Sequence, residues 1–342
     1  MSNDITPTAT GSLAPAVASM SADAVSFARQ ALATNTRRTY AAQLKLWAAH
    51  CETNGIAPFP ADAVAIANWL ASRAASGAAP SSLKAALAAV KFGHTAKGLH
   101  FDSQAPAVAA VLKGIRRESR HVPAQAEPIR GADVAAVLDS LPSSALALRD
   151  GALLALGFVF ATRRSELVAL DLGKIGDGNG AVRITAATIE MVLAKSKTNT
   201  GEPEVVTVPR SEVAGAIAAI EDWIAFAGIK PGEPLIRSVG KGGHIEGRLH
   251  PQSVPKIIKK RMAAYFIGAG VHRDTAEADA AAYSGHSLRT GFAVTAAEKG
   301  AGLQSIASVT RHKSLETPKR YAAKAEALRM SPFKFGLFKR GV

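Results

Sequence analysis

The sequence has very few cysteines: Cys51 is the only one among 342 residues. A single cysteine excludes an intramolecular disulfide and any zinc site built from several cysteines, so a reducing compartment is the expected setting. We expect Cys51 to be buried as a small apolar side chain. The sequence also offers no cluster of carboxylates of the kind that holds a metal, and it predicts no metal site.

Long hydrophobic runs are missing too. The longest apolar stretch, GALLALGFVFA from 151 to 161, is far shorter than the roughly 20 residues of a membrane span and predicts a core helix instead. The first residues have neither a basic start nor a continuous apolar region, which does not fit a signal peptide. Their Ser, Thr, Pro, Gly and Ala content predicts a flexible tail over 1–21. We therefore expect a cytoplasmic protein with no membrane partner.

Acidic residues are outnumbered by basic ones. The chain holds 27 Asp and Glu against 41 Lys and Arg, a formal net charge of +14. Such a chain is expected to bind a polyanion, because neutralising phosphates releases condensed counterions. Nucleic acid is the leading candidate, and a merely solvated basic surface is the alternative. Aromatic residues make up only 6%, which argues against an RNA-binding protein that stacks unpaired bases.

Helical patterning dominates the first third of the chain, from about residue 22 to 118. In NTRRTYAAQLKLWAAHC, Asn35 or Thr36 is predicted to cap a helix whose apolar face includes Tyr40, Leu44 and Trp47. Pro80 fits the first turn of another helix. The further helices predicted in this region cover 61–75, 80–98 and 105–120.

The segment from 118 to 131 is polar, contains two prolines and separates two well-patterned regions, so it predicts a domain boundary. Beyond it the Val, Ile and Thr content of 179–210, with TNTGEP as a turn, predicts a small antiparallel sheet with a hairpin. VGKGGHIEG, 239–247, is expected to be a loop. The remaining helices are predicted at 131–141, 144–161, 211–227, 251–266, 287–299, 303–309 and from about 318. The predicted fold class is thus mainly α with a small antiparallel β-sheet (α+β).

Cationic and histidine motifs gather in this second region. ATRRSELVAL holds Arg163 and Arg164, and the hairpin holds Lys195 and Lys197. Each motif has a structural explanation when taken singly, such as a surface ion pair on a helix or a solvated lysine. Their joint occurrence, order and spacing carry the functional inference.

Two more motifs complete the set. GHSLRTGFAV places His286 and Arg289 three residues apart, on one face of a helix. RHKSLETPKRYAA places His312 nine residues before Tyr321, one of only four tyrosines, among several cations.

This combination resembles the tyrosine recombinases, also called phage integrases, over roughly residues 24 to 325. Their catalytic domain carries an arginine in an R-x-S-E-L context, a lysine on a β-hairpin, an H-x-x-R box, a G-H about two dozen residues later and a nucleophilic tyrosine nine residues beyond. The R-x-S-E spacing selects Arg163 rather than Arg164. The resemblance implies a catalytic set of Arg163, Lys197, His286, Arg289, His312 and Tyr321.

Two positions depart from the family pattern. Ala161 and Arg311 stand where the family usually has glycine, two residues before the first arginine and directly before the second histidine. Neither change removes a catalytic group. Glycine permits backbone conformations that alanine and arginine resist, so both departures concern the local backbone.

The chemistry explains why the motif is cationic. A phosphodiester is anionic, and a tyrosine with a pKa of about 10 is scarcely ionised at neutral pH. Arg163 and Arg289 are expected to clamp the phosphate oxygens, with His312 as a third donor. The resemblance gives His286 a proton-transfer or phosphate-orienting role and makes Lys197 the acid that protonates the departing 5′ oxygen.

Tyr321 is the expected nucleophile. If Thr317 caps the last catalytic helix and Pro318 lies in its first turn, Tyr321 falls near a helix N-terminus that favours an incoming phosphate. By resemblance, Tyr321 forms a 3′-phosphotyrosyl link, and a hydroxyl from a partner duplex then attacks it. Ester is exchanged for ester, so no cofactor is expected.

The resemblance implies an architecture and partners as well. We expect a tail over 1–21, a helical SAM-like core-binding domain over 22–120, a linker over 121–128, a catalytic domain over 129–330 and a C-terminal tail over 331–342, the two domains forming a C-shaped clamp on double-stranded DNA. A homo-tetramer would join two specific sites through a Holliday junction, while the free protein is a monomer or weak oligomer. Accessory directionality factors and a bacterial, nucleoid-associated setting are part of the same expectation.

Further DNA contacts are assigned by charge alone. Basic side chains predicted to contact DNA are Arg37, Arg38, Lys84, Lys91, Lys256, Lys259, Lys260 and Arg261. By the same resemblance, the C-terminal tail, with Phe333, Phe335, Leu337 and Phe338, would pack on a neighbouring subunit, and packing on its own domain is the alternative.

Two other functions remain open on the sequence. A type IB topoisomerase shares the phosphotyrosyl chemistry but rejoins the original strand, whereas the H-x-x-R box and the separate helical domain favour a recombinase. A DNA-binding accessory protein with the same fold would be expected to have lost Tyr321 or an arginine, and neither is lost.

Overall fold

The computed structural model describes residues 21, 23, 32–119, 121, 125–194, 202–312, 314–316, 319 and 323. The chain forms two compact units, residues 1–124 and 125–342, which are described separately below. Lys195, Lys197, Tyr321 and both predicted tails, apart from residue 21, lie outside the described residues.

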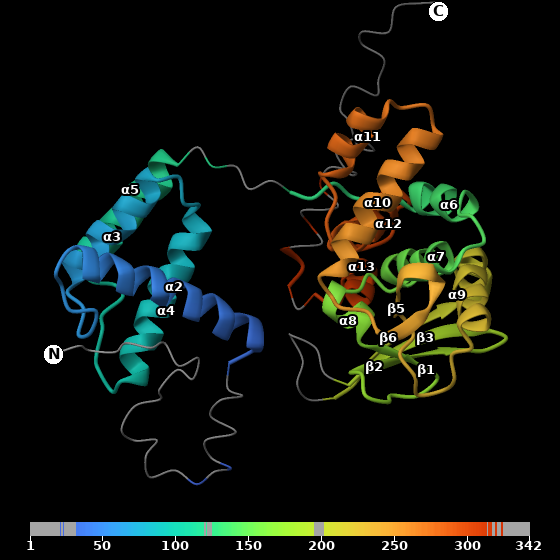
Figure 1. The fold of residues 1–342 in the computed structure, drawn as a ribbon, viewed down its shortest axis with the longest axis horizontal. Coiled ribbons are helices and arrows are strands. Elements are labelled where there is room, and N and C mark those ends of the chain that lie inside the picture. The colour runs from blue at the N-terminus through green and yellow to red at the C-terminus, as the bar shows by residue number, and fades with distance from the viewer. Residues whose placement is uncertain are drawn as a thin grey trace, which may run out of the picture. The chain divides into compact units, whose positions relative to one another are not determined.

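The first unit is helical throughout its described part. Its helices are α2 (Thr34–Thr53), α3 (Ala63–Ala75), α4 (Pro80–Ala96) and α5 (Pro106–Glu118), with α2 packed on α4 and α3 on α5 (Figure 1). Pro80 begins α4, as predicted. The predicted cap of α2 is wrong, because the helix already begins at Thr34 and encloses Asn35 and Thr36.

Aromatic side chains hold this unit together. The rings of Trp47 and Trp69 lie 5.1 Å apart in a core that also contains Leu70, Leu83 and the Cys51 thiol. Burial raises the pKa of Cys51 and keeps it a neutral apolar group, as expected.

The second unit combines helices with two small sheets, which confirms the predicted fold class. Its helices are α6 (Gly131–Asp139), α7 (Ala145–Val159), α8 (Arg164–Val168), α9 (Ala214–Ala227), α10 (Ser253–Gly268), α11 (Arg273–Ala280), α12 (Ser287–Glu298) and α13 (Leu303–Thr310). Its strands are β1 (Leu170–Leu172), β2 (Gly180–Ile184), β3 (Thr188–Leu193), β4 (Glu204–Pro209), β5 (Arg237–Val239) and β6 (Ile245–Arg248).

The larger sheet has the order β1-β2-β3-β4. The antiparallel pair β3 and β4 confirms the predicted hairpin strands, and the inward positions Ile189, Met191 and Leu193 are buried. One detail differs from the prediction: β1 runs parallel to β2. The short connection is possible because buried Asp171 accepts hydrogen bonds from the main-chain N–H groups of Gly176 and Gly178, at 2.7 and 3.0 Å.

A second correction concerns the segment 239–247, predicted as a loop. Its last residues belong to β6, which pairs antiparallel with β5 in a two-stranded sheet. Only Lys241–Gly243, a 3₁₀ turn, and its immediate neighbours form the connection.

Helix α7 is the centre of the second unit. Figure 1 shows it with the strands on one side and α6, α10 and α12 on the other. Elements pack on it from several sides, and residues 151–157, which are all apolar, are all buried. It ends at Val159, two residues before Ala161 and four before Arg163, so the core fixes where the first arginine motif begins.

None of the helices in the described ranges is both long enough and apolar enough to span a membrane.

Helix α12 is positioned by an unusually close backbone contact. A Cβ atom at Gly291 would lie 1.7 Å from the carbonyl oxygen of Ile129, so only glycine fits. Main-chain hydrogen bonds of 3.1 Å join Ile129 to Ser287 and Glu127 to Ala282. The segment that leads into α6 therefore determines the position of α12.

Replacement of Gly291 by alanine tests this contact. We expect Gly291→Ala to lower the free energy of unfolding by about 1–3 kcal/mol, because the backbone of Ile129 or α12 must move. Gly215→Ala is the matched control, since Gly215 is also helical but has no atom within 4 Å of the place that the new methyl group would take; it should be neutral or stabilising by up to about 1 kcal/mol. Urea unfolding followed by circular dichroism measures both, and equal effects would contradict the assignment.

Candidate active site

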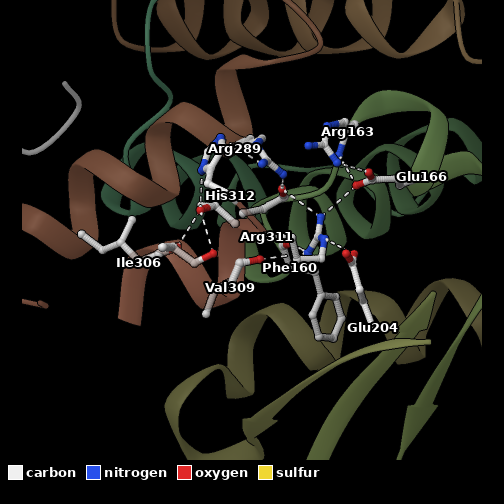
Figure 2. A network of polar contacts seen from close by, with 12 residues as sticks. Phe160, Arg163, Glu166, Glu204, Arg289, Ile306, Val309, Arg311 and His312 are labelled. Atoms are coloured by element: carbon white, nitrogen blue, oxygen red, sulfur yellow. Dashed lines mark hydrogen bonds and ion pairs between the residues drawn. The ribbon is translucent and has the colours of Figure 1, made fainter. Parts of the chain in front are cut away.

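The predicted motifs come from three separate helices but meet at one place. Arg163 directly precedes α8, Arg289 lies in the first turn of α12, and His312 follows α13. Figure 2 shows Arg289 next to His312, with Arg163 and Glu166 on the other side of Arg311. Lys197 and Tyr321 remain predictions, since they lie outside the described residues.

Arg289 and His312 form a direct hydrogen bond. Nη2 of Arg289 lies 3.1 Å from Nε2 of His312, and Nη1 donates to the carbonyl oxygen of Ala161 at 2.9 Å. A guanidinium has only donors, so Nε2 must be the acceptor and Nδ1 must carry the imidazole proton. Nδ1 then donates to the Thr310 hydroxyl at 2.7 Å, which in turn donates to the carbonyl oxygen of Ile306 at 2.6 Å. One tautomer of His312 is therefore specified.

The same surroundings keep His312 neutral. Burial and the positive charges of Arg289, Arg163 and Arg311 lower its pKa from 6.5 to about 4. Near pH 7 it thus accepts a hydrogen bond from Arg289 and carries no charge of its own.

His286, the residue before α12, has a solvent-exposed side chain. Partial desolvation lowers its pKa below 6.5, and the charges of Arg289 and Arg163 lower it further. His286 is therefore also neutral near pH 7, which suits a group that takes up or passes on a proton.

Arg163 is paired with Glu166. Nη1 of Arg163 lies 2.5 Å from Oε1, and the main-chain N–H of Arg163 donates to Oε2 at 2.9 Å. The pair does not lie on the helix surface, because the Glu166 side chain is only 7% exposed. Burial acts to raise the pKa of Glu166, yet the charges and hydrogen bonds of Arg311 and Arg163 lower it, so the carboxylate is ionised.

Both departures from the family glycines have left-handed backbone. Ala161 has φ 44° and Arg311 has φ 53°, and they are the only residues other than glycine with positive φ in the described ranges. The backbone thus keeps a conformation that glycine would adopt without strain. Sequence reasoning missed that Arg311 is buried beside Glu166; the available signal was a long cation at a position where glycine is expected.

The predicted DNA contacts differ in their placement. On the first unit Arg37, Arg38, Lys84 and Lys91 are exposed; on α10 Lys256 and Lys260 are exposed and Lys259 is half-buried. Arg261 instead donates from Nε to buried Asp150 at 2.7 Å, and its side chain is 12% exposed. Its guanidinium is engaged in the protein interior.

Within the described ranges, no group of three or more His, Cys, Asp or Glu residues has the geometry to hold a metal ion. The polar groups at the site are arginines, histidines and a carboxylate that is already shared between two arginines.

Comparison with known proteins gives this geometry its context. The model of the phage integrase family matches residues 128–327. An integrase/recombinase xerD homolog of Selenomonas ruminantium is 29% identical over 298 residues, 84% of this chain and 81% of the relative. Tyrosine recombinase XerC of Shewanella amazonensis is 26% identical over 207 residues, 60% of this chain and 58% of the relative.

Two solved structures share the fold. XerH site-specific recombinase bound to difH substrate, in a pre-cleavage complex, has a TM-score of 0.54 and 15% identity, covering 87% of this chain and 79% of that one. A variant of the Tn1549 transposon integrase in complex with transposon right end DNA has a TM-score of 0.56 and 13% identity, covering 90% and 98%.

The motifs, the fold and these matches define a class: enzymes that transfer DNA strands in site-specific recombination. The chain belongs to the phage integrase family, the tyrosine recombinases, because the family model matches more than half of it.

The neutral state of His312 makes protein stability depend on pH. As the pH falls from 6.5 towards 4, His312 becomes protonated in the unfolded chain but stays neutral in the folded protein. The free energy of unfolding therefore falls. In His312→Gln we expect the decrease in the free energy of unfolding over this pH range to be smaller than in wild type by about 1–2 kcal/mol, after allowance for solvent screening.

Urea unfolding at intervals between pH 7.5 and 4 measures the effect. His244→Gln, which changes an exposed histidine of the same unit, is the control and should follow the wild-type curve. Identical pH dependence in wild type and His312→Gln would contradict the assigned neutral tautomer.

Proposed function

We propose that this chain cleaves and rejoins double-stranded DNA at a specific site through a 3′-phosphotyrosyl intermediate on Tyr321. The observation that carries the proposal is the convergence of Arg163, Arg289 and His312 from three helices. Groups of this kind fit the non-bridging oxygens of a phosphodiester, and they stabilise the charge that accumulates during attack.

Arg163 uses only part of its guanidinium in the contact with Glu166. Its Nη1 is bonded to Glu166, while Nε and Nη2 have no acceptor among the described residues, and the side chain is 19% exposed. A planar guanidinium held by one edge in this way can offer its other donors to a phosphate.

The Arg289–His312 bond suggests how the site would respond to DNA. An incoming phosphate would replace Nε2 of His312 as an acceptor for Arg289. The same negative charge would raise the pKa of His312, so that the protonated imidazole could donate to the phosphate from Nε2 while Nδ1 stays on Thr310. In this scheme the neutral His312 belongs to the DNA-free protein.

The remaining roles complete the reaction. Lys197 would protonate the departing 5′ oxygen, and His286 would orient the phosphate or move a proton. The free 5′ hydroxyl of a partner duplex would then attack the phosphotyrosyl bond, so the ester energy is conserved and no metal or nucleotide is consumed.

The proposal extends to the assembly that exchanges the strands and to its DNA partner. Strands would be exchanged pairwise through a Holliday junction in a homo-tetramer on two DNA sites, with accessory factors setting the direction, on bacterial nucleoid DNA. The XerH and Tn1549 proteins are described in complex with DNA, which supports DNA as the partner here. The exposed cations Arg37, Arg38, Lys84, Lys91, Lys256 and Lys260, with half-buried Lys259, are proposed backbone contacts.

The alternative is an accessory protein that binds DNA without turnover. It is less well supported because the arginines and His312 form an ordered hydrogen-bonded arrangement rather than a set of unrelated surface charges. A type IB topoisomerase would share the cleavage step but would not join strands from two duplexes.

Trapping of the covalent intermediate tests the proposal. Wild type, Tyr321→Phe and the control Tyr265→Phe are incubated with nicked duplexes tiled from DNA that flanks the gene, and DNA-linked protein is detected on a denaturing gel. We expect an adduct with wild type and with Tyr265→Phe but none with Tyr321→Phe, because only the 321 hydroxyl attacks.

The outcomes separate the candidate functions. Adducts that map to Tyr321 and proceed to joined strands from two different duplexes support a recombinase. Rejoining confined to the original strand would favour the topoisomerase. Tight binding by folded wild type without any adduct would favour the accessory protein.

A further inference from the structure

Arg311 is a cation at a backbone position that suits glycine, and it is buried. Its φ of 53° is left-handed, and its side chain is only 4% exposed. A strained backbone and a desolvated charge are both unfavourable, so the side chain must gain compensating contacts.

Those contacts are made to the residue that follows α7, to α8 and to the end of α13. Nη1 of Arg311 donates to the carbonyl oxygens of Phe160 and Val309 at 2.8 and 2.9 Å. Nη2 donates to Oε2 of Glu166 at 2.8 Å. Figure 2 shows the guanidinium between Glu166 and Glu204, in the middle of the polar network.

Through Glu166, Arg311 acts on Arg163. One carboxylate serves both cations: Oε1 pairs with Nη1 of Arg163 at 2.5 Å, and Oε2 pairs with Arg311. Oε2 also accepts the main-chain N–H of Arg163. Because Arg311 fixes the carboxylate, it also fixes the plane in which Arg163 is held.

Through Ala161, Arg311 also acts on Arg289. The carbonyl oxygen of Ala161 accepts from Nη1 of Arg289 at 2.9 Å and from Nη2 of Arg311 at 3.4 Å. Ala161 is the other left-handed residue of the site. Arg163 and Arg289, the two proposed phosphate-binding arginines, therefore each share a hydrogen-bond acceptor with Arg311.

A weaker link runs to the sheet. Nε of Arg311 lies 3.7 Å from Oε2 of Glu204 at the start of β4, which is ion-pair distance but too long for a hydrogen bond. Glu204 and Arg311 line one cleft together with Val205 and His312.

We infer that Arg311 is a positioning residue, which orients Arg163 through Glu166 and Arg289 through the Ala161 carbonyl and does not touch DNA itself. This inference rests on the proposed function, because it concerns the same phosphate-binding site. Its side chain is only 4% exposed, Nη1 and Nη2 donate to protein groups, and Nε is buried beside Glu204, so its effect on catalysis is indirect.

Three variants test the inference. Arg311→Gly suits the left-handed backbone but removes the guanidinium, so a purely conformational role for this position predicts no loss. Arg311→Lys keeps the charge but loses the planar fork, and it serves if the glycine variant does not fold. Arg149→Lys is the control, since Arg149 is a similarly buried, ion-paired arginine near the opposite end of α7.

The measured quantity is the single-turnover rate of adduct formation at saturating nicked duplex carrying the site trapped above, with DNA affinity measured separately. We expect Arg311→Gly and Arg311→Lys to slow adduct formation by about 10–100-fold, with affinity within about threefold of wild type. Arg149→Lys should stay within about threefold in rate, even if its melting temperature falls.

A neutral substrate supplies a readout that loss of stability would not change. When the scissile phosphate is replaced by a methylphosphonate, the charge that Arg163 and Arg289 neutralise is absent. The difference between wild type and Arg311→Gly should then shrink to within about threefold.

Each result decides the matter. Wild-type rates in both Arg311 variants, or an equal loss on phosphate and methylphosphonate, would overturn the positioning role while wild-type adducts leave the proposed function standing. Absence of an adduct with wild type on every duplex would instead overturn the proposed function and this inference with it.

Discussion

The sharing of the Glu166 carboxylate between Arg163 and Arg311 is the constraint on which the rest of the site depends. Three charged groups, two from the start of α8 and one from the end of α13, are largely withdrawn from water, with Glu166 7% and Arg311 4% exposed. An isolated buried charge would be costly, but each group here is ion-paired and hydrogen-bonded. One carboxylate against two guanidiniums leaves a net positive site, which is the sign that an anionic ligand requires.

This excess of positive charge also contributes to the state of the histidines. Burial and the nearby arginine charges together lower the pKa of His312 and of His286, so a second proton is disfavoured on either imidazole. The arginines thus supply permanent charge, while the histidines supply hydrogen bonds of defined direction. A phosphate would change that balance when it enters, so the ligand itself sets the protonation of its binding site.

Much of this arrangement could be predicted from the sequence because the signals are local. Pro80 marks a helix start, and the apolar run 151–161 predicts the buried helix α7. Arg289 is predicted as a site residue because it stands three positions after His286. Helix α11 was missed because RDTAEADA has almost no apolar periodicity, and its place is set by packing on α10.

Other features depend on contacts between distant parts of the chain. The parallel pairing of β1 with β2 depends on a loop that Asp171 holds together. The burial of Arg311 depends on Glu166, 145 residues earlier, and its unusual position in the motif does not identify that distant partner. The wrong cap at Asn35 and Thr36 reflects the usual difficulty of placing a helix end.

The left-handed Arg311 has a consequence for anyone who moves parts between related enzymes. A glycine at this position adopts the left-handed conformation without help from other residues. With arginine, the turn before His312 depends on a carboxylate and a carbonyl group in another segment, so the sequences of the two segments must match. A chimera that took the α7–α8 junction from one parent and α13 from another would lose this contact. The two segments should therefore be taken from the same parent.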